Sequence, residues 1–295
     1  MSGIVYAFIT VLAWGTWLAP SQNVPFKNQQ IKTFYVASAN LVLAFFVALW
    51  QGFDQLDWSV FWPPFLGGLI WSASAYCAFT STSKIGIAKA FGIWAPLNII
   101  VSIIWGAVLF NEFLDTGALN MALLLVSLVI IISGVLIIIF ARGGGEKSRD
   151  RKTTLVGIAA AVGAGILWGT YFIPIKLSSV SMWVAAFPLA IGIFTGSTLL
   201  VLVGRQSIPL EKNIDYFRVC LTGVLWGIGN YGSLLLIETL GAGKGFTIAQ
   251  LSIVVNALIG IYILKDPRPG TRTASLTMAG CILATFGAII LGNLK

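Results

Sequence analysis

The chain contains no histidine, and this absence removes several kinds of chemistry. A Ser-His-Asp or Cys-His catalytic centre and a His-ligated metal site are both excluded. The three cysteines, Cys77, Cys220 and Cys281, are far apart and each lies in an apolar run. That spacing matches neither a disulfide framework nor a zinc site. We therefore expect no catalytic residue, no metal and no cofactor.

Charged side chains are also scarce. They make up 9% of the 295 residues, whereas a soluble domain carries about 25%. Apolar residues reach 58%, and the mean hydropathy is +0.93. So few charges cannot coat a water-soluble surface of this size. The composition predicts an all-α membrane protein whose main partner is the lipid bilayer.

Ten apolar segments are long enough to be membrane helices, since a helix needs about 20 apolar residues to cross roughly 30 Å of hydrocarbon. The segments are Ile4–Pro20, Phe34–Trp50, Phe61–Thr80, Ile87–Phe110, Ala118–Phe140, Leu155–Ile175, Met182–Val203, Phe217–Leu236, Phe246–Leu264 and Ser275–Leu291. The first segment lacks a basic leading region and a small-residue cleavage site, so we interpret it as a retained helix rather than a signal peptide.

Basic residues collect on one side of these segments. Of the 18 Lys and Arg residues, all but Lys176, Lys244 and Lys295 lie in the loops that follow odd-numbered segments. Because basic loops stay inside the cell, we expect the loop at 141–153 to be cytoplasmic and both termini to be external, in the cell membrane. Orientation thus explains the net charge of +8, and no nucleic-acid partner is expected.

The two halves of the chain resemble each other. Trp14–Pro20 (WGTWLAP) aligns with Trp168–Pro174 (WGTYFIP). A second alignment has an offset one residue larger than the first. It pairs Gly68, Trp71, Tyr76, Gly86, Lys89 and Phe91 with Gly223, Trp226, Tyr231, Gly241, Lys244 and Phe246. We therefore predict a first five-helix repeat at 1–140, a linker at 141–153, and a second five-helix repeat at 154–295.

An odd number of helices in each half makes the second half enter the membrane in the opposite sense. Such an inverted-topology repeat is typical of transporters that work by alternating access. A receptor or scaffold has no need of this symmetry. An intramembrane enzyme would need a nucleophile with a base, or a metal pair, and the spans supply neither.

The five-plus-five arrangement resembles the drug/metabolite transporter superfamily. Two groups of motifs are similar to the glucose/ribose porter family of sugar-uptake proteins. They are Gly68–Ser72, Ile85–Lys89 and Phe110–Glu112 in the first half, and Gly223–Asn230, Gly245-Phe246, Gln250 and Gly260–Leu264 in the second. The resemblance implies ten helices and a sugar substrate.

A sugar site combines aromatic rings with amides and hydroxyls, and several spans carry this mixture. Trp226 and Asn230 share one helix face, as do Trp94 and Asn98, because each pair is four residues apart. The predicted substrate-binding residues are Trp226, Asn230, Gln250, Trp71, Trp94, Asn98, Trp14, Trp168 and Tyr171. Two alternatives remain open: the amides join helices, or the tryptophans form an interfacial belt.

Lys89 and Lys244 occupy related positions in the two halves and are predicted to gate opposite faces. The alternatives are that they extend to the membrane surface, or that they bind an anionic substrate. The acidic residues lie in loops or at helix edges, and Glu238 is the one close to a span. It is the candidate for proton or cation coupling, and a facilitator is the alternative.

These observations together predict an alternating-access transporter for a neutral monosaccharide, facilitative or cation-coupled. An amino acid, a phosphorylated metabolite, a nucleotide sugar or a drug is the alternative cargo. The last segment carries small residues at Gly280, Ala284, Gly287 and Ala288. They are expected to pack against the fifth segment, and a homodimer through these two segments is the alternative.

Overall fold

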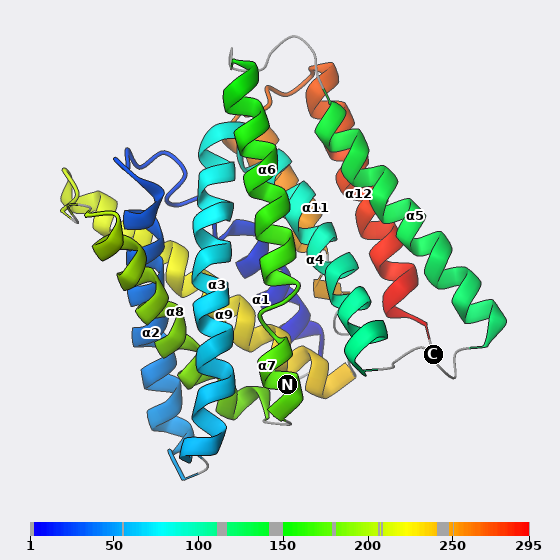
Figure 1. Ribbon diagram of the computed structural model, residues 1–295. Coiled ribbons are helices and arrows are strands. Elements are labelled where there is room, and N and C mark those ends of the chain that lie inside the picture. The colour runs from blue at the N-terminus through cyan, green and yellow to red at the C-terminus, as the bar shows by residue number, and fades with distance from the viewer. Residues whose placement is uncertain are drawn as a thin grey trace.

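Helices make up almost all of the described chain and pack together in one bundle (Figure 1). The computed structural model describes residues 3–54, 56–110, 117–141, 150–178, 181–205, 207, 209–240, 248–249 and 251–294. No strand occurs among these residues. The helices are α1 (Gly3–Thr16), α2 (Gln29–Gln51), α3 (Trp58–Ile85), α4 (Ile87–Phe110), α5 (Ala118–Phe140), α6 (Arg151–Trp168), α7 (Ile173–Ser178), α8 (Met182–Val203), α9 (Asn213–Leu240), α11 (Ser252–Leu258), the π-helical η1 (Ile259–Ile263) and α12 (Arg272–Gly292).

Seven spans of the described chain are long and apolar enough to cross a membrane: α2, α4, α5, α6 with α7, α8, α9 and α12. The apolar helices α1 and α11 with η1 are shorter. Helix α3 has 28 residues but contains many Ser, Thr, Tyr and Trp side chains, which lower its hydropathy. Ser72, Ser74 and Ser81 are buried, so its polar groups face protein rather than lipid.

The repeated Trp-Gly-Thr motif interrupts a helix in both halves. Helix α1 ends at Thr16, and turns carry the chain past Pro20. Helix α6 ends at Trp168, and the chain resumes as α7 at Ile173, just before Pro174. Proline disfavours helical geometry in the residue before it and lacks an N–H donor. The first and sixth segments are therefore broken, whereas the sequence analysis had expected each of them to be one continuous helix.

Aspartate side chains cap the starts of α3 and α6. Asp57 accepts hydrogen bonds from Ser59 Oγ (2.6 Å) and Val60 N–H (2.9 Å), and these bonds lower the pKa of its carboxyl group. Asp150 accepts from Thr153 N–H (3.2 Å) at the start of α6. Helix α6 begins at Arg151, within the segment 141–153 that was expected to be the linker.

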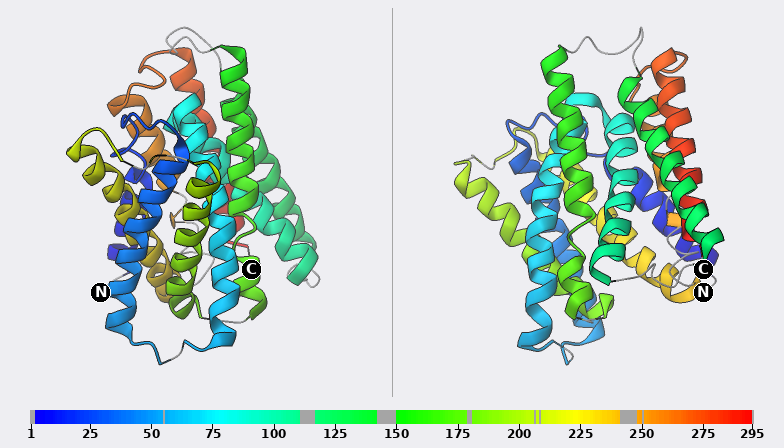
Figure 2. Two further views of the ribbon diagram at one scale, coloured as in Figure 1. Left: turned by 60° about the vertical axis from the view of Figure 1, so that its left-hand side comes forward. Right: turned by 45° about the vertical axis from the view of Figure 1, so that its right-hand side comes forward.

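The helices pack mainly across the two halves. The most extensive contacts join α3 to α8 and α6, α1 and α2 to α9, α4 to α6, and α5 to α12. Helices α5 and α12 lie side by side at one edge of the bundle (Figures 1 and 2). Both ends of the described chain lie toward one end of the bundle, and the last residues of α5 and the first residues of α6 lie toward the opposite end (Figure 1).

The small residues of α12 face α5 of the same chain. A methyl group added to Gly134 would lie 2.7 Å from Gly280 O and 2.8 Å from Ala284 N. One added to Gly287 would lie 2.9 Å from Ser127 O. The absence of side chains therefore lets the two backbones approach closely. This internal packing accounts for the stripe of small residues without a second copy of the chain.

Gly134→Ala is expected to destabilise the protein by about 1–3 kcal/mol, the usual cost of overpacking, although alanine is the better helix former. The measurement is the unfolding midpoint of the detergent-purified protein. Gly163→Ala in α6 is the matched control, because its methyl group would meet only Cys77 Sγ, at 3.7 Å. Equal midpoints for the two variants would contradict the close α5–α12 contact.

Candidate functional site

Five tryptophans from different parts of the chain meet in the core. Trp71 contacts Trp226 (ring centroids 4.5 Å apart) and Trp168 (5.8 Å). Trp168 also contacts Trp94 (5.5 Å) and Trp17 (6.3 Å). None of the five is more than 8% exposed. These five residues are named the Trp cluster below, and four of them belong to the set of substrate-binding residues predicted from sequence.

The Trp cluster lies inside the protein and not in a lipid-facing belt. Trp50 and Trp58, which end or begin helices, are by contrast 84% and 73% exposed. In the Trp cluster the centroid distances fall in the range of about 4.5–7 Å at which aromatic rings attract one another. The rings meet tilted or edge-on, with interplanar angles of 54° to 67°.

Trp14 and Tyr171 lie at the border of the same core. Trp14 Nε1 donates a hydrogen bond to Trp226 O over 3.3 Å, which joins α1 to α9. Gly229 permits this approach, since a methyl group there would lie within 2.6 Å of Trp14 Nε1. Tyr171 is partly buried in the turn between α6 and α7 and packs against the same core.

The amides divide into two kinds. Asn256 is fully buried, and its Nδ2 donates to Gly15 O over 3.2 Å, so it joins α11 to α1. Asn98 Oδ1 accepts from Ser102 Oγ (3.3 Å) within α4. Asn98 and Asn230 are both partly exposed, which leaves them accessible to a ligand. Asn256 thus has the helix-joining role that the sequence analysis gave as the alternative for all the amides.

Lys89 is buried at the start of α4 and does not extend to the membrane surface. It is 8% exposed, and its Nζ donates to Ala141 O over 2.8 Å, which ties α4 to the end of α5. Lys244 and Gln250 lie outside the described residues. Glu238 lies in the last turn of α9, but its side chain is outside the described part. Within that part, no three Cys, Asp or Glu side chains gather as a metal site would require.

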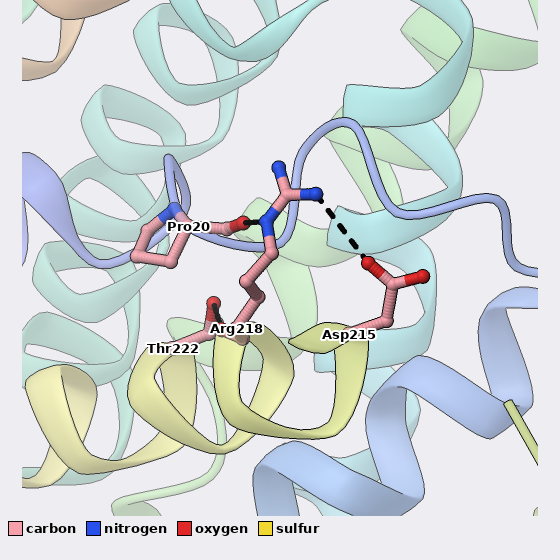
Figure 3. Close-up of polar contacts among 4 residues, drawn as sticks. All are labelled: Pro20, Asp215, Arg218 and Thr222. Carbon is pink, nitrogen blue, oxygen red and sulfur yellow. Dashed lines mark hydrogen bonds and ion pairs between the residues drawn. The ribbon is translucent and has the colours of Figure 1, made fainter. Parts of the chain in front are cut away.

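A set of polar contacts holds the α1–α2 connector, residues 17–28, against α9 (Figure 3). Arg218 Nε donates to Pro20 O (2.9 Å), and Arg218 Nη1 lies 3.4 Å from the Asp215 carboxylate. Thr222 Oγ1 donates to Ser21 Oγ over 2.7 Å. We refer to these contacts as the connector latch. The sequence gave no sign of it, because Arg218 binds a backbone carbonyl 198 residues away.

The connector also forms a wall of a polar pocket of about 470 Å³. Lys32 lines this pocket and is 2% exposed, with its Nζ 4.6 Å from the centre of the Phe79 ring. Phe79 in turn contacts Trp17, at 5.7 Å between ring centroids. Phe79 therefore contacts both Lys32, which lines the pocket, and Trp17 of the Trp cluster. Lys32 was not among the residues predicted from sequence.

A family model described as sugar transport protein matches residues 5–294. The chain belongs to this family. The glucose uptake protein GlcU of Bacillus subtilis (strain 168) is 24% identical over 295 residues, which cover 99% of this chain and 98% of the relative. A protein of Enterococcus faecalis, provisionally named a sugar uptake protein, is also 24% identical and covers 99% of both chains. The expected resemblance to sugar-uptake proteins is confirmed.

A solved crystal structure shares the fold, with a TM-score of 0.62 and 17% sequence identity over 98% of this chain and 95% of the other. That similarity extends to the fold alone. Together with the apolar helices, membership of the sugar transport protein family makes the chain an integral membrane protein of a transport class, and sugar transport is not an enzyme class.

Thr222→Val is expected to destabilise the protein by about 1–3 kcal/mol, because it leaves the buried Ser21 hydroxyl without its partner. Amide hydrogen exchange in the α1–α2 connector should rise together with the drop in unfolding midpoint. The control is Thr239→Val in the same helix, where an exposed hydroxyl bonds only to Leu235 O in its own turn. Unchanged exchange in residues 17–28 would contradict the connector latch.

Proposed function

We propose that this member of the sugar transport protein family carries a neutral monosaccharide across the cell membrane by alternating access. Its two halves, joined by the linker near 141–153, act as inverted repeats that exchange conformations. Two kinds of observation support this proposal. They are family membership over residues 5–294 and a pattern of contacts that repeats when the two halves are exchanged.

The repeat pattern is visible in the helix contacts. Exchanging the halves pairs α1 with α6, α2 with α8, α3 with α9, α4 with α11 and α5 with α12. Under this exchange the α3–α6 contact becomes α9–α1, the α3–α8 contact becomes α9–α2, and the α4–α6 contact becomes α11–α1. All six contacts are present. A symmetric contact network is what allows two halves to swap conformations around a central site.

The same exchange holds for individual residues, and this observation carries the proposal. A methyl group on Gly15 would overlap the Val255 side chain and lie 3.4 Å from Ser252 O. A methyl group on Gly169 would lie 2.5 Å from Val101 Cβ and 2.9 Å from Asn98 O. Gly15 and Gly169 are related by the repeat, and each lies against a valine and a backbone carbonyl of the helix that the exchange pairs, α11 for Gly15 and α4 for Gly169.

The Trp cluster lies where the halves meet. Trp17, Trp71 and Trp94 come from the first half, and Trp168 and Trp226 come from the second. In this mechanism, a rocking motion separates these rings and frees their faces for the C–H surface of a sugar, while Asn98, Asn230 and Gln250 bind its hydroxyls. The connector latch and Lys89 hold one face closed, and Lys244 acts at the other face.

The excess of basic residues assigns the connector face to the cytoplasm and both termini to the exterior. Transport is facilitative, or coupled to a cation through Glu238. A neutral sugar, rather than an anion, fits the aromatic and amide composition of the centre.

Counterflow of labelled D-glucose and D-ribose into proteoliposomes tests the proposed substrate class. Trp226→Ala and Trp226→Phe are expected to raise the half-saturation concentration, the former at least about tenfold, or about 1.4 kcal/mol, because the ring that faces Trp71 is lost or reduced. Trp58→Ala is the matched control, since Trp58 is 73% exposed. Exchange of an amino acid, a sugar phosphate or a nucleotide sugar but of no neutral sugar would disprove the assignment.

The orientation is tested with single cysteines in a chain whose native cysteines are replaced by alanine. Asn23 and Asp54 are exposed and flank α2 at its two ends. A membrane-impermeant thiol reagent added to intact cells should label Asp54→Cys and leave Asn23→Cys unmodified until the membrane is permeabilised. The reverse pattern would show that the connector face is external.

A further inference from the structure

The polar pocket beside the α1–α2 connector has the dimensions of a ligand site. It holds about 470 Å³, and small-molecule sites occupy about 300–1,000 Å³. The connector, the start of α2, the end of α3 and the segment after η1 form its walls. None of its described lining residues belongs to the Trp cluster.

Lys32 is a buried cation that lacks an oxygen partner within the described part of the chain. Its side chain is 2% exposed, and its ammonium lies 4.6 Å from the Phe79 ring centre and 5.9 Å from that of Phe26. No carboxylate or carbonyl of the described residues accepts a hydrogen bond from it. An ammonium group removed from bulk water needs acceptors for its N–H donors, and the pocket is where those acceptors can lie.

The composition of the walls decides the kind of ligand. Asp266 is 9% exposed and lines the same pocket as Lys32, so an acidic and a basic side chain share its walls. The amides of Asn23 and Gln29 and the hydroxyl of Ser83 add both donors and acceptors. A sugar hydroxyl both donates and accepts, and therefore suits this mixture. A phosphate group would be attracted by Lys32 but repelled by the carboxylate of Asp266.

We propose that this pocket is a second monosaccharide site, at the connector face, in which Lys32 donates to sugar hydroxyls and Asp266 accepts from them. The inference rests on the proposed transport of a neutral sugar. It adds a second binding position for that sugar, between the Trp cluster and the adjacent aqueous compartment. Because the connector latch holds the wall of the pocket, opening of the latch and release of the sugar are coupled at this face.

The experiment uses Asn23→Cys, which places an exposed thiol in the pocket wall, in the full-length chain with the native cysteines replaced by alanine. The measured quantity is the rate of alkylation by N-ethylmaleimide in purified protein. Saturating D-glucose is expected to slow this rate at least threefold by the mass-action occupancy of the site, and D-glucose 6-phosphate to slow it less. Asp54→Cys, at the other end of α2, should show no protection.

Lys32→Gln should abolish the protection, whereas Lys27→Gln, an exposed lysine of the same connector, should keep it. If Lys32→Gln does not fold, Ser83→Trp supplies the test. Ser83 is exposed at the pocket wall, so an indole there fills the entrance, and Ser83→Ala is its control. Protection that survives both Lys32→Gln and Ser83→Trp, or that is stronger with the sugar phosphate, would overturn the proposal.

The failure of this inference can be told apart from the failure of the proposed function. Counterflow of D-glucose without any protection at Asn23→Cys would remove the second site and leave the transport assignment intact. Protection without counterflow of any neutral sugar would keep the binding site and remove the transport assignment.

Discussion

The structure depends on how closely its helices can approach one another inside lipid. Bilayer hydrocarbon offers no partners for polar groups, so these must be satisfied within the protein. A methyl group on Gly68 would overlap Leu189 O of α8, and one on Gly223 would overlap Val36 O of α2. Because glycine removes this obstacle, the relatively polar helices α3 and α9 fit tightly against the other half of the chain. Buried groups such as Ser74, which donates to Ala164 O over 2.8 Å, then find partners.

Large and small residues have separate places in this arrangement. Glycines lie where backbones touch, and five tryptophan rings fill the centre where the halves meet. Aromatic pairs add about 0.5–1.5 kcal/mol beyond the area they bury, so the Trp cluster stabilises the observed conformation. The polar contacts at the α1–α2 connector act at one face only.

The sequence predicted most of the fold, because membrane helices follow from composition and length alone. It also named Trp71, Trp94, Trp168 and Trp226 as substrate-binding residues, a role that stays a prediction, and these four lie together in the Trp cluster. The breaks after Thr16 and Trp168 were not predicted, because apolar residues continue through both. Lys32 and Arg218 were missed for a different reason. Their partners are a phenylalanine ring and a backbone carbonyl that are distant in sequence, and neither leaves a pattern in the sequence.

The interlocking of the halves has a consequence for how the protein is made. The main contacts of α1, α2 and α3 are with α9, α8 and α6, all of which the ribosome synthesises later. The first five helices therefore enter the bilayer with groups such as Ser74 unpaired, because its acceptor, Ala164 O, lies in α6 and is made later. The chain repeats itself in sequence but has a single core that both halves complete, so neither half alone contains the information for a stable product of translation.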